Sequence, residues 1–193
     1  MTNRIHPIEA ESYRILAARL DLSSWSPLAR EVVARMIHAS ADLDYAASVR
    51  ATEAAVQAGI DALRAGAPVV CDAHMVRVGI GDVAAVCLLD DVAVAPPGST
   101  RSAAAIRLAA ERHPDGAVFV IGNAPTALFE LLAMDVRPAL VVGLPVGFVG
   151  AAESKAALLD SGLPCITNVG EKGGSAVAAA AVNAIVRLSK EPS

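Results

Sequence analysis

Aromatic residues and long apolar runs are scarce in this sequence, and their scarcity excludes several classes of protein. Aromatic residues make up only 3% of the 193 residues, so the chain lacks the stacking platforms on which single-stranded nucleic acids bind. The net charge is −4 and no lysine or arginine run offsets it, which also argues against a nucleic-acid partner. The most apolar run, 175–186, is too short to span a bilayer and contains Asn183, so we expect no membrane partner.

Cysteines are few, and familiar nucleotide motifs are missing. Cys71, Cys87 and Cys165 lie far apart in strand-like runs, which indicates buried free thiols in a reducing cytosol and offers no metal-ligand spacing. The N-terminal residues contain no apolar segment of the signal-peptide type, so we expect a cytoplasmic protein. No strand precedes a Gly-x-Gly-x-x-Gly, and neither a P-loop nor a Gly-x-Ser-x-Gly elbow occurs, so dinucleotide sites, P-loops and serine hydrolases lack support.

Apolar residues, in contrast, are abundant and regularly patterned. They make up 54% of the chain against 19% charged residues, which is enough for a sizeable core, and we expect a single domain over 1–193. Short Val/Ile/Leu runs alternate with helical periods, a pattern typical of an α/β fold with a mostly parallel sheet, helices on both faces and extra helices at the N-terminus. The expected helices are 8–20, 27–38, 47–64, 99–112, 124–134, 149–159 and 174–189, and the expected strands are 68–72, 83–89, 92–94, 116–121, 139–142 and 164–167.

Each of the last three strands ends in a glycine-containing loop that opens a helix. These loops are 122–126, 143–147 and 170–175. Ligands of open α/β sheets bind outside the carboxyl ends of the strands, and free N–H groups at helix starts favour anions there. Glycines also serve simply as turn formers, so any one loop alone carries little weight. Three at one edge favour an anionic ligand.

The segment Arg35-Met36-Ile37-His38-Ala39 is the strongest candidate for chemistry. Val32, Val33, Met36 and Ile37 form one apolar stripe of a helix, while Arg35 and His38 lie three residues apart on another face. Imidazole can donate and recover a proton near neutral pH, so His38 is a candidate general acid. The alternative is a histidine at a helix end, favoured there by the helix dipole.

Other polar groups are weaker candidates. The triplet Thr100-Arg101-Ser102 begins a helix, where a cation opposes the helix dipole, so Arg101 is a candidate partner for a carboxylate from outside the protein. Lys172 lies similarly, just before the last helix. Asp72-x-His74 lacks a third ligand, so we expect no metal. Glu153, Ser154 and Lys155 begin a helix and are expected to be solvated.

Several segments together resemble the precorrin-8X methylmutase family, which includes the cobalt-precorrin-8 methylmutases. The matching segments run through nearly the whole chain in the order of the family: Arg35-Met36-Ile37-His38-Ala39, Thr100-Arg101-Ser102-Ala103-Ala104, Gly122-Asn123-Ala124-Pro125-Thr126-Ala127-Leu128, the long block 145–155, and Gly173-Gly174-Ser175 with 178–180. The long block through Lys155 is the most specific of them.

The resemblance implies a cofactor-free isomerase. Such an enzyme moves a methyl group from C-11 to C-12 of precorrin-8X to give hydrogenobyrinate, or cobyrinate when cobalt is present. It also implies a parallel α/β fold, a homodimer, an active-site histidine at His38, and substrate contacts at Ser12, Arg35, Thr100, Arg101, Ser102 and Asn123. A large apolar ring fringed with acetates and propionates needs an apolar cleft, cations at its rim and one proton donor, which agrees with the residues above.

Two departures from the family and two rival interpretations remain. Glu171 stands where the family commonly has a basic residue, and the segment 79–83 is shorter than in the family. A nucleotide-dependent reductase or methyltransferase on the same kind of sheet would need a glycine fingerprint that is absent. A non-catalytic corrinoid carrier would keep the cleft and lose turnover. The sequence does not indicate whether the natural substrate carries cobalt.

Overall fold

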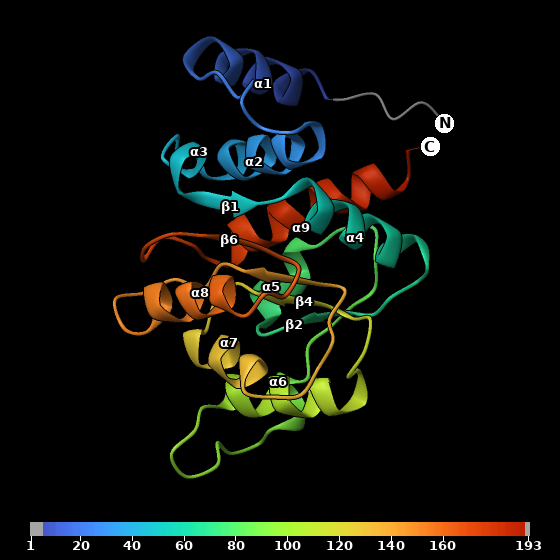
Figure 1. Ribbon diagram of the computed structural model, residues 1–193, viewed down its shortest axis with the longest axis vertical. Coiled ribbons are helices and arrows are strands. Elements are labelled where there is room, and N and C mark those ends of the chain that lie inside the picture. The colour runs from blue at the N-terminus through green and yellow to red at the C-terminus, as the bar shows by residue number, and fades with distance from the viewer. Residues whose placement is uncertain (1–5, 192–193) are drawn as a thin grey trace.

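The computed structural model describes residues 6–191 and contains one six-stranded sheet (Figure 1). The strands are β1 (Val49–Ala51), β2 (Val69–Cys71), β3 (Ala85–Val86), β4 (Val118–Ile121), β5 (Leu140–Gly143) and β6 (Cys165–Asn168), arranged in the order β1-β6-β5-β4-β2-β3. Strands β2 to β6 are parallel, and β1 pairs antiparallel with β6 at one edge. The predicted mostly parallel α/β fold is therefore confirmed.

Helices cover both faces of this sheet. One face carries α2 (Pro27–Ser40), α4 (Glu53–Arg64), α5 (His74–Gly79) and α9 (Ser175–Ser189), and the other carries α6 (Arg101–Arg112), α7 (Pro125–Leu132) and α8 (Ala151–Asp160). Alternate strand residues enter the two cores: Val118 and Val120 face α9, whereas Phe119 and Ile121 face α6 and α7. Both faces are buried, which is why the strands read as unbroken apolar runs.

The remaining elements lie outside these layers. Helix α1 (Pro7–Arg19) rests on α2 at one end of the molecule (Figure 1), and only Leu16 of α1 is buried. A short helix α3 (Tyr45–Ser48) leads into β1, and a 3₁₀ turn, η1 (Leu89–Asp91), follows β3. Between residues 6 and 191 no helix is both long and apolar enough to cross a membrane.

Three predictions about the elements are wrong. The helix expected over 47–64 is divided into α3, β1 and α4, because Thr52 accepts a hydrogen bond from Ala55 N–H and caps a new helix. The strand expected over 83–89 is only Ala85–Val86, and no strand forms over 92–94, since the chain turns away through η1 after β3. The six-residue helix α5 is not predicted by the sequence.

Candidate active site

The C-terminal end of α2 lies at the carboxyl edge of the parallel strands. Helices α2 and α9 are packed together and run antiparallel, as two ion pairs show: Arg187 near the end of α9 binds Glu31, and Lys172 just before α9 binds Asp42 after α2. Because α9 begins where β6 ends, the end of α2 lies at that same edge. This packing places His38, two residues before the end of α2, on the side where α/β proteins bind ligands.

His38 is held by two neighbouring residues of α1. Its Nδ1 atom lies 2.7 Å from the hydroxyl oxygen of Ser12, and its ring stacks on that of Tyr13 with a centroid separation of 5.1 Å and an interplanar angle of 16°. All three side chains are half-buried. Within residues 6–191 the Nε2 atom of His38 has no hydrogen-bond partner. The ring is therefore oriented through one nitrogen and one face while its second nitrogen stays available.

Arg35 also lies between α1 and α2, on the same helix face as His38, as the three-residue spacing of Arg35 and His38 predicts. Its guanidinium forms an ion pair with Glu9 of α1, and both side chains are half-buried. Partial burial lowers the pKa of Arg35, but Tyr13 and Glu9 more than offset this effect, so its pKa is raised overall. The arrangement keeps Arg35 charged and ties α1 to α2 beside His38. Tyr13 and Glu9 were not predicted as site residues, although an i, i+3, i+4 spacing of Glu9, Ser12 and Tyr13 on one helix was visible in the sequence.

The triplet at the start of α6 makes contacts within the protein. Thr100 caps α6 by accepting from Ala103 N–H at 3.1 Å, and its hydroxyl lies 2.8 Å from that of Thr126. Arg101 donates to the carbonyl oxygens of Leu89 and Val92, both at 2.9 Å. These residues lie on the other face of the sheet from His38. In this structure the Arg101 guanidinium thus holds the η1 segment.

The backbone N–H groups of the loop after β4 are bound by a side chain of the protein itself. The carboxylate of Asp72, which is fully buried, accepts hydrogen bonds from the N–H groups of Gly122, Asn123 and Ala124 at 2.7–2.9 Å. Burial raises the pKa of Asp72 even though these three donors oppose the shift. The expectation that these N–H groups are free for a ligand anion is therefore wrong. Asn123 could contact a substrate only through its side chain, which is exposed.

Among the remaining polar candidates, Lys172, Ser154 and Lys155 differ from their predictions. His74 pairs with Asp90 at 3.0 Å, and among the described residues no group of three or more ligand side chains could hold a metal ion. Lys172 is bound to Asp42 and Asp44 at 2.8 and 2.6 Å. Ser154 and Lys155 are buried rather than solvated, because α8 turns this face toward β6 and the loop that follows it.

A cavity of about 670 Å³ opens at the carboxyl edge of the sheet. Its lining comes from α5 and from the start of α9: His74, Met75, Val78, Gly79, Gly173, Gly174, Ser175 and Ala176. Helix α9 has no side-chain cap, and the Ser175 hydroxyl is buried without a partner among the described residues. Strand β2 lies between β3 and β4, so the chain order reverses beside this cavity, as at the ligand sites of open sheets.

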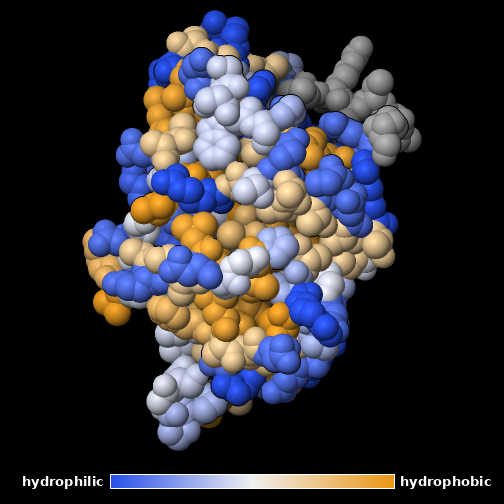
Figure 2. Space-filling model, in the orientation of Figure 1, coloured by the Kyte–Doolittle hydropathy of each residue, from blue (hydrophilic) through white to orange (hydrophobic). Residues whose placement is uncertain are grey.

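Exposed apolar side chains accompany the carboxyl edge. Met75 and Val78 of the cavity are largely exposed, and so are Phe148 (91%) and Val149 (87%) in the loop before α8. Figure 2 shows apolar surface across the middle of one face, interrupted by a band of hydrophilic side chains. Apolar patches of this kind mark ligand or protein contacts.

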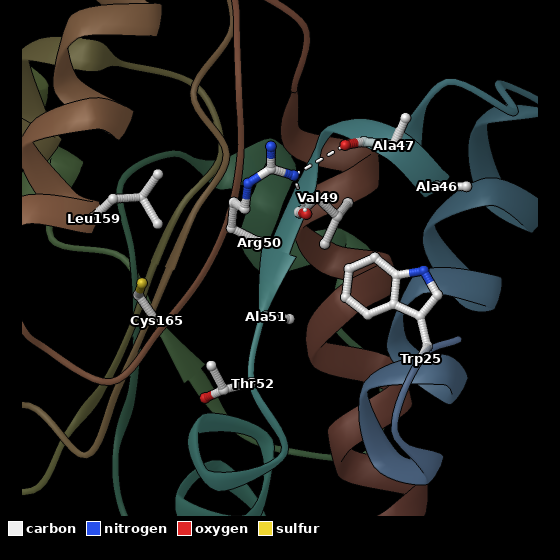
Figure 3. A pocket seen from close by; sticks show the side chains of 9 residues that line it. All are labelled: Trp25, Ala46, Ala47, Val49, Arg50, Ala51, Thr52, Leu159 and Cys165. Carbon is white, nitrogen blue, oxygen red and sulfur yellow. Dashed lines mark hydrogen bonds between the residues drawn. The ribbon is translucent and has the colours of Figure 1, made fainter. Parts of the chain in front are cut away.

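A second cavity, of about 410 Å³, lies at the β1 edge of the sheet (Figure 3). It is lined by Trp25, Ala46, Ala47, Val49, Arg50, Ala51, Thr52, Leu159 and Cys165. The Arg50 guanidinium donates to the carbonyl oxygens of Ala47 and Val49 at 2.9 and 2.8 Å, and Val49 N–H donates to Tyr45. These contacts block the open edge of the sheet against pairing with another strand.

A family model for precorrin-8X methylmutase matches residues 7–188. The chain belongs to the precorrin-8X methylmutase family. It is 40% identical over 204 residues to a cobalt-precorrin-8 methylmutase of Priestia megaterium, covering 98% of this chain and 90% of that one. It is 42% identical over 194 residues to a precorrin-8X methylmutase of Pseudomonas aeruginosa, covering 92% and 93%.

A solved structure agrees with these sequence comparisons. The precorrin-8X methylmutase of Thermus thermophilus superposes with a TM-score of 0.85 at 41% identity, covering 95% of this chain and 98% of that one. The precorrin-8X methylmutase fold is thus present over nearly the whole length. The chain is an enzyme of the isomerase class, a methylmutase of cobalamin biosynthesis, as its motifs predict.

Proposed function

We propose that the protein moves the methyl group from C-11 to C-12 of precorrin-8X, giving hydrogenobyrinate, with His38 as the proton donor. The observation that carries this proposal is the orientation of the His38 ring by Ser12 and Tyr13, which leaves Nε2 without a protein partner. A histidine that served only the helix end would not need a dedicated hydroxyl on Nδ1 and an aromatic ring on its face.

The proposed step needs one proton and no external reagent. Donation of a proton from Nε2 to the macrocycle makes the ring system electron-poor, which lowers the barrier to migration of the methyl group with its bonding pair. The C-11 bond breaks as the C-12 bond forms, and the proton returns to His38. Ser12 accepts from Nδ1–H while the imidazole is charged and so keeps one tautomer ready for the next cycle.

We propose that the macrocycle lies at the carboxyl edge, with its apolar ring near Met75, Val78 and the start of α9. The cavity there is apolar, and the exposed side chains around it suit a large ring. Arg35, Thr100, Arg101, Ser102 and Asn123 remain predicted rim contacts. For Arg101 this contact would require release of the two carbonyl groups that it binds in this structure.

The cobalt-containing substrate is the second candidate. Relatives of both kinds match at nearly equal identity, 40% for the cobalt-precorrin-8 methylmutase of Priestia megaterium and 42% for the precorrin-8X methylmutase of Pseudomonas aeruginosa. Identity therefore does not select between the two substrates. We favour the metal-free one as the working proposal and expect it to give the larger kcat/KM when both are assayed side by side.

We further propose a homodimer in the cytoplasm. Phe148 and Val149, which are exposed in the loop before α8, would be covered in a dimer. The three cysteines are free thiols, as a reducing compartment favours.

The test is the His38→Ala variant assayed with precorrin-8X. General acid–base assistance is typically worth about 10²–10⁴-fold, so we expect turnover to fall by that factor while affinity for hydrogenobyrinate is nearly unchanged. Lower melting temperature with normal turnover per folded molecule would instead identify a helix-end histidine. Wild-type protein that binds hydrogenobyrinate but converts neither substrate would be a corrinoid carrier.

A further inference from the structure

Lys155 is a buried ammonium for which the proposed chemistry has no use. It lies in the second turn of α8, and only 1% of its surface is exposed. Its Nζ atom donates to the side-chain oxygen of Asn168 at 3.1 Å and to the backbone carbonyl of Lys172 at 2.5 Å. Both acceptors are neutral, so the charge is buried without a carboxylate in hydrogen-bond contact, a costly arrangement.

The carbonyl that Lys155 binds belongs to the irregular loop 169–174. The same carbonyl accepts a second hydrogen bond from the Asn168 amide at 2.9 Å. The loop is tied to the neighbouring 144–147 segment by Gly174 N–H to Leu144 at 2.8 Å and by Gly147 N–H to Glu171 at 3.2 Å. Lys155 thus binds the loop near its middle, at the carbonyl of Lys172.

This loop contributes to the two parts of the candidate site. Its backbone at Gly173 and Gly174 forms a wall of the 670 Å³ cavity. Its Lys172 side chain reaches Asp42 and Asp44, in the turn that follows the helix of His38. Any shift of the Lys172 carbonyl would therefore move the cavity wall and the contact behind His38 together.

We propose that Lys155 is a positioning residue of the methylmutase, whose ammonium fixes the 169–174 loop and thereby the cavity wall and the start of α9. The proposal rests on the proposed function for its kinetic consequence, but not for its structural one. A role as nucleophile or general base is a poorer fit, because Nζ is enclosed and already directed at two acceptors. Burial lowers the pKa of Lys155 to about 8, so the clamp is fully charged only below that pH.

The test compares wild type with Lys155→Met, which keeps the length of the side chain and removes the charge and the donors. Lys190→Met is the matched control, since Lys190 is half-exposed and pairs with Asp82. By amide hydrogen exchange we expect Gly147 and Gly174 to lose protection in Lys155→Met. Ala139, which donates to the carbonyl oxygen of Ala117 just before β5 and β4 begin, should keep its protection. Unchanged exchange at both glycines in the folded variant would overturn the proposal.

Kinetics with precorrin-8X provide the second measurement. Misplacement of a site wall by about 1 Å can cost on the order of 10²-fold in rate, so we expect kcat/KM of Lys155→Met to fall roughly 10–100-fold. The wild-type to variant ratio should be constant below about pH 7 and decline above pH 8, where wild-type Lys155 loses its charge. A ratio that stays constant through pH 10 would contradict a role for the ammonium.

Two outcomes separate this proposal from the proposed function. If the loop loses protection in Lys155→Met and wild type does not convert precorrin-8X, the positioning role of Lys155 is supported and the proposed substrate is contradicted. Normal turnover in a folded Lys155→Met would support the assignment and contradict the clamp. If Lys155→Met does not fold, Lys155→Gln replaces it: loop protection reduced relative to wild type supports the clamp, and unchanged protection overturns it.

Discussion

At the scale of single residues, the site depends on the contacts that α1 makes with His38. Ser12 binds one nitrogen of the imidazole and Tyr13 covers its face, so two residues of α1 determine where the second nitrogen of a residue on α2 points. Orientation of an acid through its other ring nitrogen is a recurring device in histidine catalysis. As the proposed proton donor, His38 should therefore affect turnover separately from the two residues that orient its ring.

The Ser12→Ala variant tests whether orienting the His38 ring and donating the proton have separate effects on turnover. In Ser12→Ala the imidazole loses its Nδ1 partner, and a hydrogen bond of this kind contributes about 0.5–1.5 kcal/mol. We expect kcat to fall by about 2–13-fold, far less than in His38→Ala, with KM little changed. Steady-state kinetics with precorrin-8X measure this, and Ser23→Ala, at an exposed hydroxyl in the loop before α2, is the control. A loss as large as that of His38→Ala would make Ser12 a proton-transferring group.

At the scale of elements, close backbone contacts between loops form the carboxyl edge. Gly173 approaches the β5–α8 loop so closely that a Cβ atom added there would lie 2.3 Å from the carbonyl oxygen of Leu144 and 2.5 Å from that of Pro145. A backbone oxygen cannot rotate away as a side chain does. The glycine is therefore required by the contact between the two loops.

Gly173→Ala should separate these loops and deform the cavity wall. Since the strain must be relieved by backbone movement, we expect a loss of stability of about 1–3 kcal/mol and weaker binding of hydrogenobyrinate. Gly81→Ala is the control, because no atom lies within 4 Å of a Cβ added there and its φ is ordinary. Equal denaturation midpoints for the two variants would show that the loops accommodate the extra atom.

At the scale of the whole molecule, the buried charge of Lys155 gives folding stability a pH dependence. The pKa of Lys155 is about 8 in the folded chain against an ordinary value of 10.5. Between these values the unfolded chain binds one proton more than the folded chain, so stability rises with pH there, and below pH 8 the penalty of the buried charge is constant.

Comparison with Lys155→Met isolates this contribution from other titrating groups. We expect the unfolding free energy of wild type minus that of Lys155→Met to increase by up to about 3 kcal/mol between pH 7.5 and 10.5, since one pKa unit corresponds to about 1.4 kcal/mol. Urea denaturation at four or five pH values measures the difference. A difference that decreases with pH would have the wrong sign for a buried ammonium.

Association is the other property of the whole molecule. A dimer that covers Phe148, Val149 and their apolar neighbours would bury about 800 Å² or more per subunit if it is of ordinary size. We expect light scattering to give twice the chain mass at micromolar concentration, and Phe148→Asp to shift the protein toward monomer. A fully active wild-type monomer would contradict the prediction, and unchanged dimers of Phe148→Asp would place the interface elsewhere.

The sequence was enough to predict the layers of the fold, and the family resemblance made His38 the candidate for the reactive residue. Continuous apolar strands alternating with amphipathic helices can bury their surfaces only as a sheet covered on both faces, and the spacing of Arg35 and His38 placed them on one helix face. Local patterns of this kind need no knowledge of distant contacts. The short elements β1 and α5 escaped prediction because their few residues carry too weak a period.

Tertiary structure alone decided which polar groups were free. Asp72 and the loop 122–124 are 50 residues apart in the sequence. The Asp72 carboxylate nevertheless accepts hydrogen bonds from the N–H groups that were predicted to bind a ligand. From the sequence, Lys155 was predicted to be a solvated helix residue. In the structure α8 directs its side chain toward the loop after β6. Burial and partnership depend on which segments meet in space, and a buried charge is tolerated only where those segments supply its hydrogen bonds.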